Sequence, residues 1–535
     1  MQTSLRRGLA TLATSALTLG VLAVSAPAQA AGTTDPQPAR ATAAWLVKNL
    51  NSQHLVEITS EYGTSTSYGT TIDLANALSA VGGHEATVSR IADAIAANLD
   101  SYAGEGADVY AGSTAKALDL FLRDGRGASD VVQRLEGTVT ASGAARGRLV
   151  DVSQWGDYAN TIGQAFAAKA LSAAKSTRAD DVTDFLLQQQ CTDGFFRLDF
   201  ARQPMDDKYY AAPDLTSDQS CDGAATAVDP AQGADTTALV AIQTAALAKG
   251  DPEVKAALTR AAAWLKKQQK ADGSFVDPDN GANANTTGLA GWALAELGED
   301  AAAAKAASWL RARQVVGACA PAALKSDAGA VAYDDLAWTN GAKWGLAEAL
   351  DRSQWVMAGV QAVPALLAAP AATAKDTVSL PKFAQAGSTV TAKVQGLAAG
   401  EPACATGAVA KQLLGTGGTL SLALARAKAG TRTFAVSSAA GTVRASVTVL
   451  GKKKLTVKLA KKAKLGTKQT VTVKGLAAGE KVTLKVKGKK VSTGKASKKG
   501  TFTKKVKVGS KRGTVKVSVV GQYKNRTGSA KVKVK

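Results

Sequence analysis

Histidine is nearly absent from this chain, whose 535 residues include only His54 and His84. Both lie near the start of the sequence and far from any cysteine, so a zinc site that combines histidine with cysteine and aspartate is not expected. No Cys-Gly-Glu-Gln stretch occurs either, which excludes an internal thioester. We therefore predict no metal and no cofactor.

Long apolar runs are missing after the first 30 residues. Residues 1–30 have the pattern of a secretory signal: Arg6 and Arg7 open it, an apolar run follows, and Ala28-Gln29-Ala30 supplies small residues for cleavage. No later run is long enough to span a bilayer, since Pro364 and Pro370 interrupt the nearest candidate. We expect an exported bacterial protein without a transmembrane segment.

Cysteine is scarce but even in number, with four residues. In an exported chain this count suggests disulfides. Cys191 and Cys221 flank one long irregular segment and form the preferred pair. The remaining pair would be Cys319–Cys404, which would join the helical part to the next domain.

Acidic residues almost vanish at the end of the chain. Residues 451–535 contain 28 Lys plus Arg and one acid, Glu480, a net charge of +27 within a chain whose total is +22. The alternation of valine and lysine predicts short strands of a sandwich with lysines facing water. Such a surface attracts polyanions. Phe502 and Tyr523 are its only aromatics, so base stacking and nucleic-acid binding are not expected. Anionic wall polymers or a membrane surface are the expected partners; alternatively, the lysines only keep the sheet soluble.

The region 36–357 alternates six times between an amphipathic helix and an apolar, small-residue helix. Six apolar helices open at polar pairs, which we interpret as N-caps. These pairs are Thr70-Thr71, Ser113-Thr114, Asn160-Thr161, Thr236-Thr237, Thr286-Thr287 and Thr339-Asn340. Helices that are apolar all round must be buried on every side. The pattern therefore predicts a closed double ring, an α6/α6 toroid, with an insert at 191–233 that is a candidate lid over the mouth.

Two stretches repeat one motif: "FLLQQQCTDGFF" (185–196) and "WLKKQQKADGSF" (264–275). "WLRARQVVG" (309–317) is a degenerate third copy. The motif resembles the Gln/aromatic repeat of squalene and oxidosqualene cyclases, and so the terpenoid cyclase/protein prenyltransferase α/α-toroid superfamily. The resemblance implies a toroid in which Gln190 and Gln269 bond a neighbouring helix end.

An Ala/Pro-rich linker is predicted at 358–375. Two immunoglobulin-like β domains should follow, at 376–450 and 452–535, because "QGLAAGE" (395–401) recurs as "KGLAAGE" (474–480). The fold class predicted is thus multidomain, α then β, with an α6/α6 toroid before two β-sandwiches.

Squalene-type cyclases use an aspartic acid within Asp-X-Asp-Asp-Thr-Ala. The corresponding stretch here is "GADTTA", where Asp235, Thr237 and Ala238 match but two acids are replaced. The resemblance implies Asp235 as a candidate general acid. A helix cap explains the same residue without catalysis.

The loops that enter the apolar helices carry a second set of candidates. In a toroid the helix starts gather at one mouth, where aromatic, amide and carboxylate groups suit a small ligand with an apolar body and polar edges. The predicted ligand-binding residues are Tyr68, Asp73, Tyr110, Trp155, Asp157, Tyr158, Asp235, Asn285, Tyr333, Asp334, Asp335 and Trp338.

Three functions remain open at this point. The first is a cell-surface protein that binds a small, largely apolar molecule at the toroid mouth and contacts anionic polymers through its basic domain. The second is a cyclase-like enzyme that uses Asp235. The third is a structural wall protein whose barrel is plugged.

Overall fold

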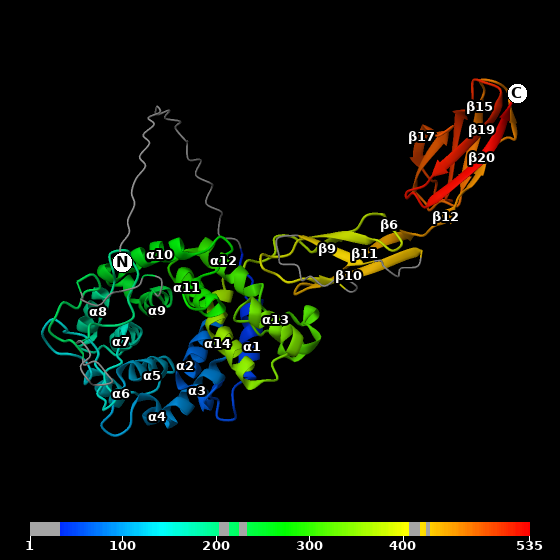
Figure 1. Cartoon of the computed structure of the whole chain (residues 1–535). Coiled ribbons are helices and arrows are strands. Elements are labelled where there is room, and N and C mark those ends of the chain that lie inside the picture. The colour runs from blue at the N-terminus through cyan, green and yellow to red at the C-terminus, as the bar shows by residue number, and fades with distance from the viewer. Residues whose placement is uncertain (1–32, 203–212, 224–229, 231–232, 406–417, 424–428) are drawn as a thin grey trace, which may run out of the picture.

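The computed structural model describes residues 33–202, 213–223, 230, 233–405, 418–423 and 429–535. A helical domain comes first, and two β modules extend from it as an arm (Figure 1). The predicted signal at 1–30 and most of the segment 202–210 lie outside the described residues.

Six helices form a closed inner ring. Each packs against the next, and the last packs against the first. In ring order they are α2 (Tyr68–Val81), α5 (Ala111–Arg123), α7 (Thr161–Ala173), α9 (Gly233–Thr244), α11 (Ala284–Glu296) and α14 (Ala349–Leu366). Their alanines and leucines are buried almost throughout, which explains why the sequences of all of them except α5 show little amphipathic pattern.

Six amphipathic helices surround this ring. They are α1 (Gln37–Val47), α3 (Glu85–Ala97), α6 (Ser129–Glu136), α8 (Ala179–Gln188), α10 (Pro252–Gln268) and α12 (Asp300–Arg311). The predicted α6/α6 toroid is therefore confirmed by the helix packing. Shorter elements connect these helices. Two are the short helices α4 (Leu99–Ala103) and α13 (Asp335–Trp344), and three are the 3-10 turns Leu247–Lys249, Gly317–Cys319 and Ala322–Asp327. Two are β-hairpins, β1 (Glu57–Ser60) with β2 (Gly63–Thr66) and β3 (Val276–Asp277) with β4 (Gly281–Ala282).

The sixth inner helix differs from the prediction. Thr339 and Asn340 lie in α13, which packs on the 3-10 turn Ala322–Asp327 and not in the ring. Its place is taken by α14, which continues to Leu366 through Pro364. The predicted linker at 358–375 is thus wrong over its first half, because buried small residues such as Ala358 and Ala362 pack against neighbouring helices.

The repeated motif joins the outer helix α8 to α10, and α10 to α12. Gln190 donates to the carbonyls of Gly194 (2.9 Å) and Ala257 of α10 (2.8 Å). Gln269 repeats this with Gly273 (3.2 Å) and Ala302 of α12 (2.9 Å). The glycines have positive φ, and an added Cβ would strike the backbone of the following outer helix. The predicted bridging role of the two glutamines is confirmed.

The degenerate third copy closes the ring. Gln314 donates to the carbonyl of Pro38 in α1, at 2.7 Å. Its glycine is Gly329 rather than Gly317, since a Cβ at Gly329 would lie 2.2 Å from the carbonyl oxygen of Ala41. Two 3-10 turns separate the glutamine from its glycine, which hides this copy in the sequence.

Most of the six polar pairs that were predicted as N-caps do not cap their helices. Asn160 does cap α7, because its side chain accepts from the N–H groups of Ile162 and Gly163. The hydroxyls of Thr71, Thr237 and Thr287 instead lie inside their helices. They accept from the N–H of Val56 (2.9 Å), Phe196 (2.9 Å) and Phe275 (3.0 Å), respectively. The threonines therefore hold the ends of outer-helix turns against the inner ring.

The first β module has two sheets around one core of valine, alanine and leucine. One sheet has the order β5-β7-β9 and the other β6-β11-β10-β8. The strands are β5 (Thr377–Ser379), β6 (Phe383–Gln385), β7 (Thr389–Gln395), β8 (Cys404–Ala405), β9 (Gly418–Ala423), β10 (Gly430–Ser438) and β11 (Gly441–Leu450).

The second β module repeats this two-sheet plan. Its sheets have the orders β13-β15-β18 and β12-β20-β19-β16-β17, with β14 beside β20. Valines from both sheets share one core. Both modules fit the predicted sandwich class. The strands are β12 (Lys453–Lys454), β13 (Thr456–Lys458), β14 (Lys462–Ala463), β15 (Lys468–Lys474), β16 (Lys481–Val486), β17 (Lys489–Lys495), β18 (Thr501–Lys507), β19 (Gly513–Val520) and β20 (Arg526–Val534).

Disulfides join Cys191 to Cys221 and Cys319 to Cys404, the two predicted pairs. The second one links the toroid to the first β module. Among the described residues, the helices are all too short or too polar to cross a membrane.

Candidate functional site

A cavity of about 340 Å³ opens between the starts of α5 and α7. Inner-helix starts face one end of the toroid, so the cavity lies at the predicted mouth. It is lined by Tyr102, Tyr110, Gly112, Ser113, Lys116, Asp151, Tyr158, Ala159, Asn160, Ile162, Gly163 and Phe166. Tyr110 and Tyr158 belong to the predicted binding set.

Glycines bring the backbones close around the cavity. A Cβ at Gly163 would lie 2.8 Å from the Cα of Gly112, so α5 and α7 touch at their first turns. A Cβ at Gly69 of α2 would lie 3.7 Å from the Tyr102 hydroxyl. Small residues at these helix starts therefore let three inner helices converge below the opening.

Lys116 is the only cation in the lining. Its Nζ lies 2.7 Å from Asp73 and 5.4 Å from the centre of the Phe166 ring. Burial disfavours the ammonium, but Asp73 and Tyr102 outweigh this effect and raise the pKa of Lys116. Lys116 is therefore charged at neutral pH. Asp73 does not line the cavity itself, but it is the partner of Lys116, which does.

Asp151 fixes the segment that covers α5 and α7. It accepts from the N–H of Ala111 (2.7 Å), at the start of α5, and of Tyr158 (3.1 Å). Burial raises the pKa of Asp151, against these backbone bonds. Burial likewise raises the pKa of the Tyr102 phenol.

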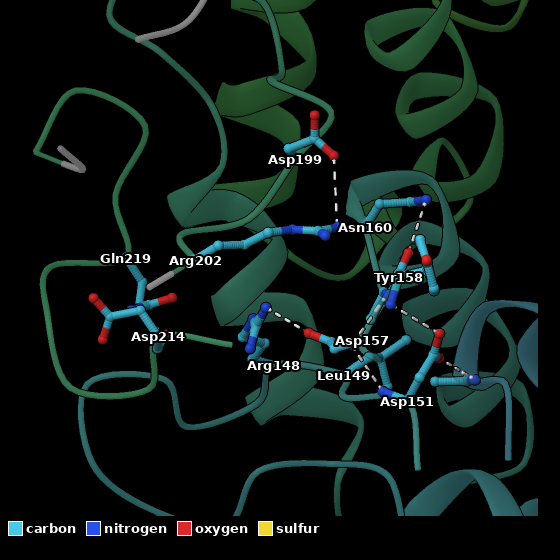
Figure 2. A network of polar contacts seen from close by, with 12 residues as sticks. Arg148, Leu149, Asp151, Asp157, Tyr158, Asn160, Asp199, Arg202, Asp214 and Gln219 are labelled. Carbon is cyan, nitrogen blue, oxygen red and sulfur yellow. Dashed lines mark hydrogen bonds and ion pairs between the residues drawn. The ribbon is translucent and has the colours of Figure 1, made fainter. Parts of the chain in front are cut away.

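Asp157 links the same segment to Arg148 (Figure 2). Its carboxylate lies 2.8 Å from the fully buried Arg148 and accepts from the N–H of Asp151 (2.9 Å) and Ala159 (3.1 Å). With all these bonds Asp157 orients the loop and does not face the cavity. Its neighbour Trp155 projects into solvent with 56% of its surface exposed.

Tyr68 acts on the cavity through a neighbour. Its hydroxyl donates to Asn98 (3.3 Å), and its ring lies 5.9 Å from that of Tyr102. It therefore supports Tyr102 from the side of α2.

Asp235 belongs to a second group at the mouth, on α9 and α11. It is the third residue of α9, so it is not the residue that precedes the helix. Its Oδ1 is buried without a hydrogen-bond partner, as is Oδ1 of Asn285. Burial raises the pKa of Asp235 to about 6, against the hydrogen bond with Thr286. Burial, Asp277, Asp334 and Asp235 together raise the pKa of Tyr333.

The last three predicted residues lie on or next to α13, outside the ring. Asp334 caps this helix by accepting from the N–H of Ala337 (2.7 Å). Asp335 is exposed and pairs with Arg313 (2.7 Å), while Trp338 stacks on Trp355. These contacts account for all three residues as parts of the scaffold.

Charged side chains cross the barrel below the cavity. Asp119 lies 3.0 Å from Lys169 and 3.2 Å from Arg123, and Lys169 donates to Gln243 (3.1 Å). This network joins the second halves of α5, α7 and α9, where Arg123 and Lys169 stay partly exposed. The cavity is therefore a cup at the starts of these helices, at the other end from the network.

Lys116, Tyr102, Asp151 and Phe166 were not predicted as site residues. One signal was available: Lys116 and Lys169 are charges on helices that are otherwise apolar and buried, where a cation needs a specific partner. Tyr102 and Asp151 gave no such signal, since they lie in segments distant in sequence that the fold brings together.

No protein-family model matches the chain, and no curated protein matches its sequence. Solved structures that resemble it include a protein from Actinoplanes, with 17% identity, a TM-score of 0.41 and coverage of 62% of this chain and 99% of that chain. The type II terpene cyclase MstE from Scytonema has 15% identity, a TM-score of 0.42 and coverage of 62% and 97%. The α-1,6-mannanase GH76A of Salegentibacter sp. HEL1_6 has 10% identity, a TM-score of 0.41 and coverage of 62% and 98%.

These similarities span proteins of unlike activity at low identity. The toroid assignment therefore rests on the ring of helix contacts in this chain, and the activity must be argued from its own residues.

Proposed function

We propose that the toroid binds a small, hydroxyl-bearing molecule in the cavity between α5 and α7. The lining of this cavity carries the proposal: three tyrosines, one ammonium, one carboxylate and one amide surround a single aromatic floor, Phe166. Asp151, Asn160 and Lys116 already have partners within the protein. The carboxylate has further lone pairs, however, and the amide and the ammonium have further N–H groups, so the set can still bond hydroxyls beside one apolar face. It suits a polar ring compound better than the largely apolar ligand expected from the sequence.

Exposed apolar side chains near the mouth support a ligand that extends beyond the cavity. Among the described residues of the toroid, nine large apolar residues are at least 38% exposed, on segments that lead to inner-helix starts, in the first turn of α14 or on the adjoining α13. They are Tyr62, Val152, Trp155, Tyr158, Leu198, Val276, Leu336, Trp344 and Leu350. Exposed apolar patches commonly mark interaction sites.

Export and surface contact complete the proposal. A secretory leader, two disulfides and a basic terminal module together suit a protein that acts outside the cell, where the basic module contacts anionic polymers. Retention on isolated cell walls tests this part: it should fall when residues 451–535 are deleted and when salt is raised. Retention that survives both treatments would overturn the surface role.

Native mass spectrometry of the purified protein tests ligand binding first. Titration with a panel of mono- and oligosaccharides, and with apolar terpenoids as the contrasting class, then separates the two ligand chemistries. We expect the saccharide class to bind, and Tyr102→Phe to weaken binding about tenfold by removing one hydroxyl. Tyr68→Phe is the matched control, because its hydroxyl bonds Asn98. A panel without any binder would favour a plugged, structural barrel.

Proton donation by Asp235 is a second candidate function. A specific observation favours it: the Oδ1 atom is buried and unpartnered, and the pKa of about 6 leaves the acid partly protonated near neutral pH. Asp235→Asn should abolish any turnover of polyprene substrates. Unchanged turnover, or none in the wild-type protein, would leave Asp235 as a buried scaffold residue.

A further inference from the structure

The outward face of the sheet β12-β20-β19-β16-β17 carries alternating lysine, serine and threonine. Along β19, Val515, Val517 and Val519 are buried while the residues between them point outward. Strand β20 follows the same rule, with Lys531 and Lys533 exposed beside buried Val532. The period of two therefore gives one face to the core and the other mostly to polar side chains, with Val520 and Val491 as the exceptions.

Four pairs of lysines lie opposite each other on neighbouring strands of this sheet, including β14 beside β20. The pairs are Lys481–Lys495, Lys485–Lys490, Lys516–Lys531 and Lys462–Lys533. Like charges in opposed positions repel and weaken strand pairing. The sequence nevertheless places lysines opposite each other on several pairs of neighbouring strands.

No acid compensates these lysines within residues 451–535. The one acid there, Glu480, is fully buried and bonded to Arg526, at 2.7 and 2.8 Å. In this module, all of which the structure describes, the one ion pair is that internal one. The lysine face is thus an uncompensated cationic array.

We propose that this face binds a linear polyanion with closely repeated phosphate or carboxylate groups. The inference rests on the proposed surface role of the basic module and assigns that role to one sheet. Side chains on one face recur about every 6.6–6.8 Å along a strand and about every 4.7–4.9 Å between strands. A chain with one charge per repeat unit meets several lysines in such a grid. The hydroxyls of Thr483, Ser518 and Ser529 add donors between the charges.

A polymer fits this module better than a lipid surface. Leu465 and Val491 are its only large apolar side chains that are exposed, so it has no aromatic or aliphatic group set to insert into a bilayer. The opposite sheet also carries an opposed pair, Lys468–Lys507, and so offers a second cationic surface against which the assignment to one face can be compared.

Binding of long-chain inorganic polyphosphate to the full-length protein, followed across a salt series, tests the proposal. Four substitutions on the face, Lys485→Gln, Lys490→Gln, Lys516→Gln and Lys531→Gln, are combined in one variant. We expect its affinity at about 0.15 M salt to fall at least tenfold, and the slope of log affinity on log salt to decrease by about 3–4. The same four positions changed to arginine should keep the affinity.

A matched variant on the other sheet, with Lys468, Lys474, Lys505 and Lys507 changed to Gln, decides whether one face is the site. We expect it to lose clearly less affinity. Equal losses would overturn the assignment to one face, and so would binding to phosphatidylglycerol vesicles without binding to polyphosphate. Urea midpoints at or above the wild-type value would show that the variants are folded.

This outcome is independent of cell-wall retention. If deletion of 451–535 abolishes retention while the two four-lysine variants behave alike, the surface role stands and the assignment to one face fails. If the face variant alone loses polyphosphate but retention persists after deletion, the face is a polyanion site and the surface role fails.

Discussion

The two copies of the Gly-Leu-Ala-Ala-Gly-Glu loop, at 396–401 and 475–480, have the same internal structure but different partners. In each copy the buried glutamate accepts from a backbone N–H of its own loop, Ala398 at 2.9 Å and Ala477 at 2.7 Å. Each also accepts from the N–H of a hairpin residue, Ala440 or Gln522. The loop is therefore a repeated device that fixes one corner of each sandwich.

The arginine nearest the loop glutamate comes from the same module in the second copy and from the toroid in the first. Glu480 binds Arg526 of its own module, whereas Glu401 lies 3.9 Å from Arg311 at the end of α12. Alignment of the buried valines of β11 and β20 puts Gly441 where Arg526 stands. The first module thus lacks an arginine at the position of Arg526, and its glutamate faces one from the toroid. The second module therefore supplies both charges of this pair, whereas the glutamate of the first module faces an arginine of the toroid.

Removal of the internal pair should have the largest effect. Glu480→Gln leaves the nearly buried Arg526 without its counter-charge, so we expect the second module to lose roughly 3–5 kcal/mol of unfolding free energy. Urea unfolding followed by hydrogen exchange of backbone amides within residues 451–535 measures this loss. The double variant Glu480→Gln/Arg526→Leu should regain part of it. A loss below about 1 kcal/mol would mean that the pair is not needed.

Substitution by alanine should cost more stability at Gly400 than at Gly479, the equivalent glycine of the second loop. A Cβ at Gly400 would lie 2.0 Å from the carbonyl oxygen of Ser308 in α12, whereas one at Gly479 would meet only the flexible end of Lys382. Both residues have positive φ, so both alanine variants carry strain of about 1 kcal/mol. We expect Gly400→Ala to cost about 1–3 kcal/mol more, seen as a lower melting temperature of the toroid and first module. Equal costs would contradict close docking of the loop on α12.

The glutamate of the first module should matter less than that of the second. Glu401→Gln keeps an acceptor oxygen for only one of its two backbone donors, which bond separate carboxylate oxygens, but Arg311 keeps Asp35 at 2.9 Å and the carbonyl of Pro370 at 3.1 Å. We therefore expect a loss of about 1 kcal/mol, measured by urea unfolding. If this variant is as damaging as Glu480→Gln, Arg311 depends on Glu401 more than its distances indicate.

Acid should reduce the difference between Glu480→Gln and the wild-type protein. Burial opposes ionisation of Glu480, but bonds from Arg526 and two backbone N–H groups prevail and lower its pKa. A lowered carboxyl pKa gives stability that is present above the unfolded value, about 4.3, and is lost as pH falls through the folded value. Unfolding free energies of both proteins at pH 7 and at pH 3 should therefore converge at the lower pH. A constant difference would point to packing rather than charge.

The sequence was sufficient for the broad architecture. Six alternations of apolar and amphipathic helices predicted the closed double ring, because a helix that is apolar on all sides must be enclosed. The prediction was wrong at the sixth inner helix, where Thr339-Asn340 imitated a helix start and the buried small residues after Ala358 imitated a linker. Alanine and proline suit both settings, so composition alone did not separate them.

The candidate site was only partly foreseeable. Tyr110 and Tyr158 could be predicted because they precede inner helices in the sequence, and both line the cavity. Lys116 and Asp151 were not, since their roles depend on partners distant in sequence, Asp73 and the start of α5.

Periodicity by itself determined the ring of helices, the valine–lysine sheets and their charge, because burial of apolar surface acts through patterns local to each element. The tertiary structure alone decided which side chains meet: Arg311 with Glu401, Lys116 with Asp73, and the cup above the charged network. Such pairs depend on distances between elements far apart in sequence, and electrostatic and hydrogen-bond energies fall steeply with those distances.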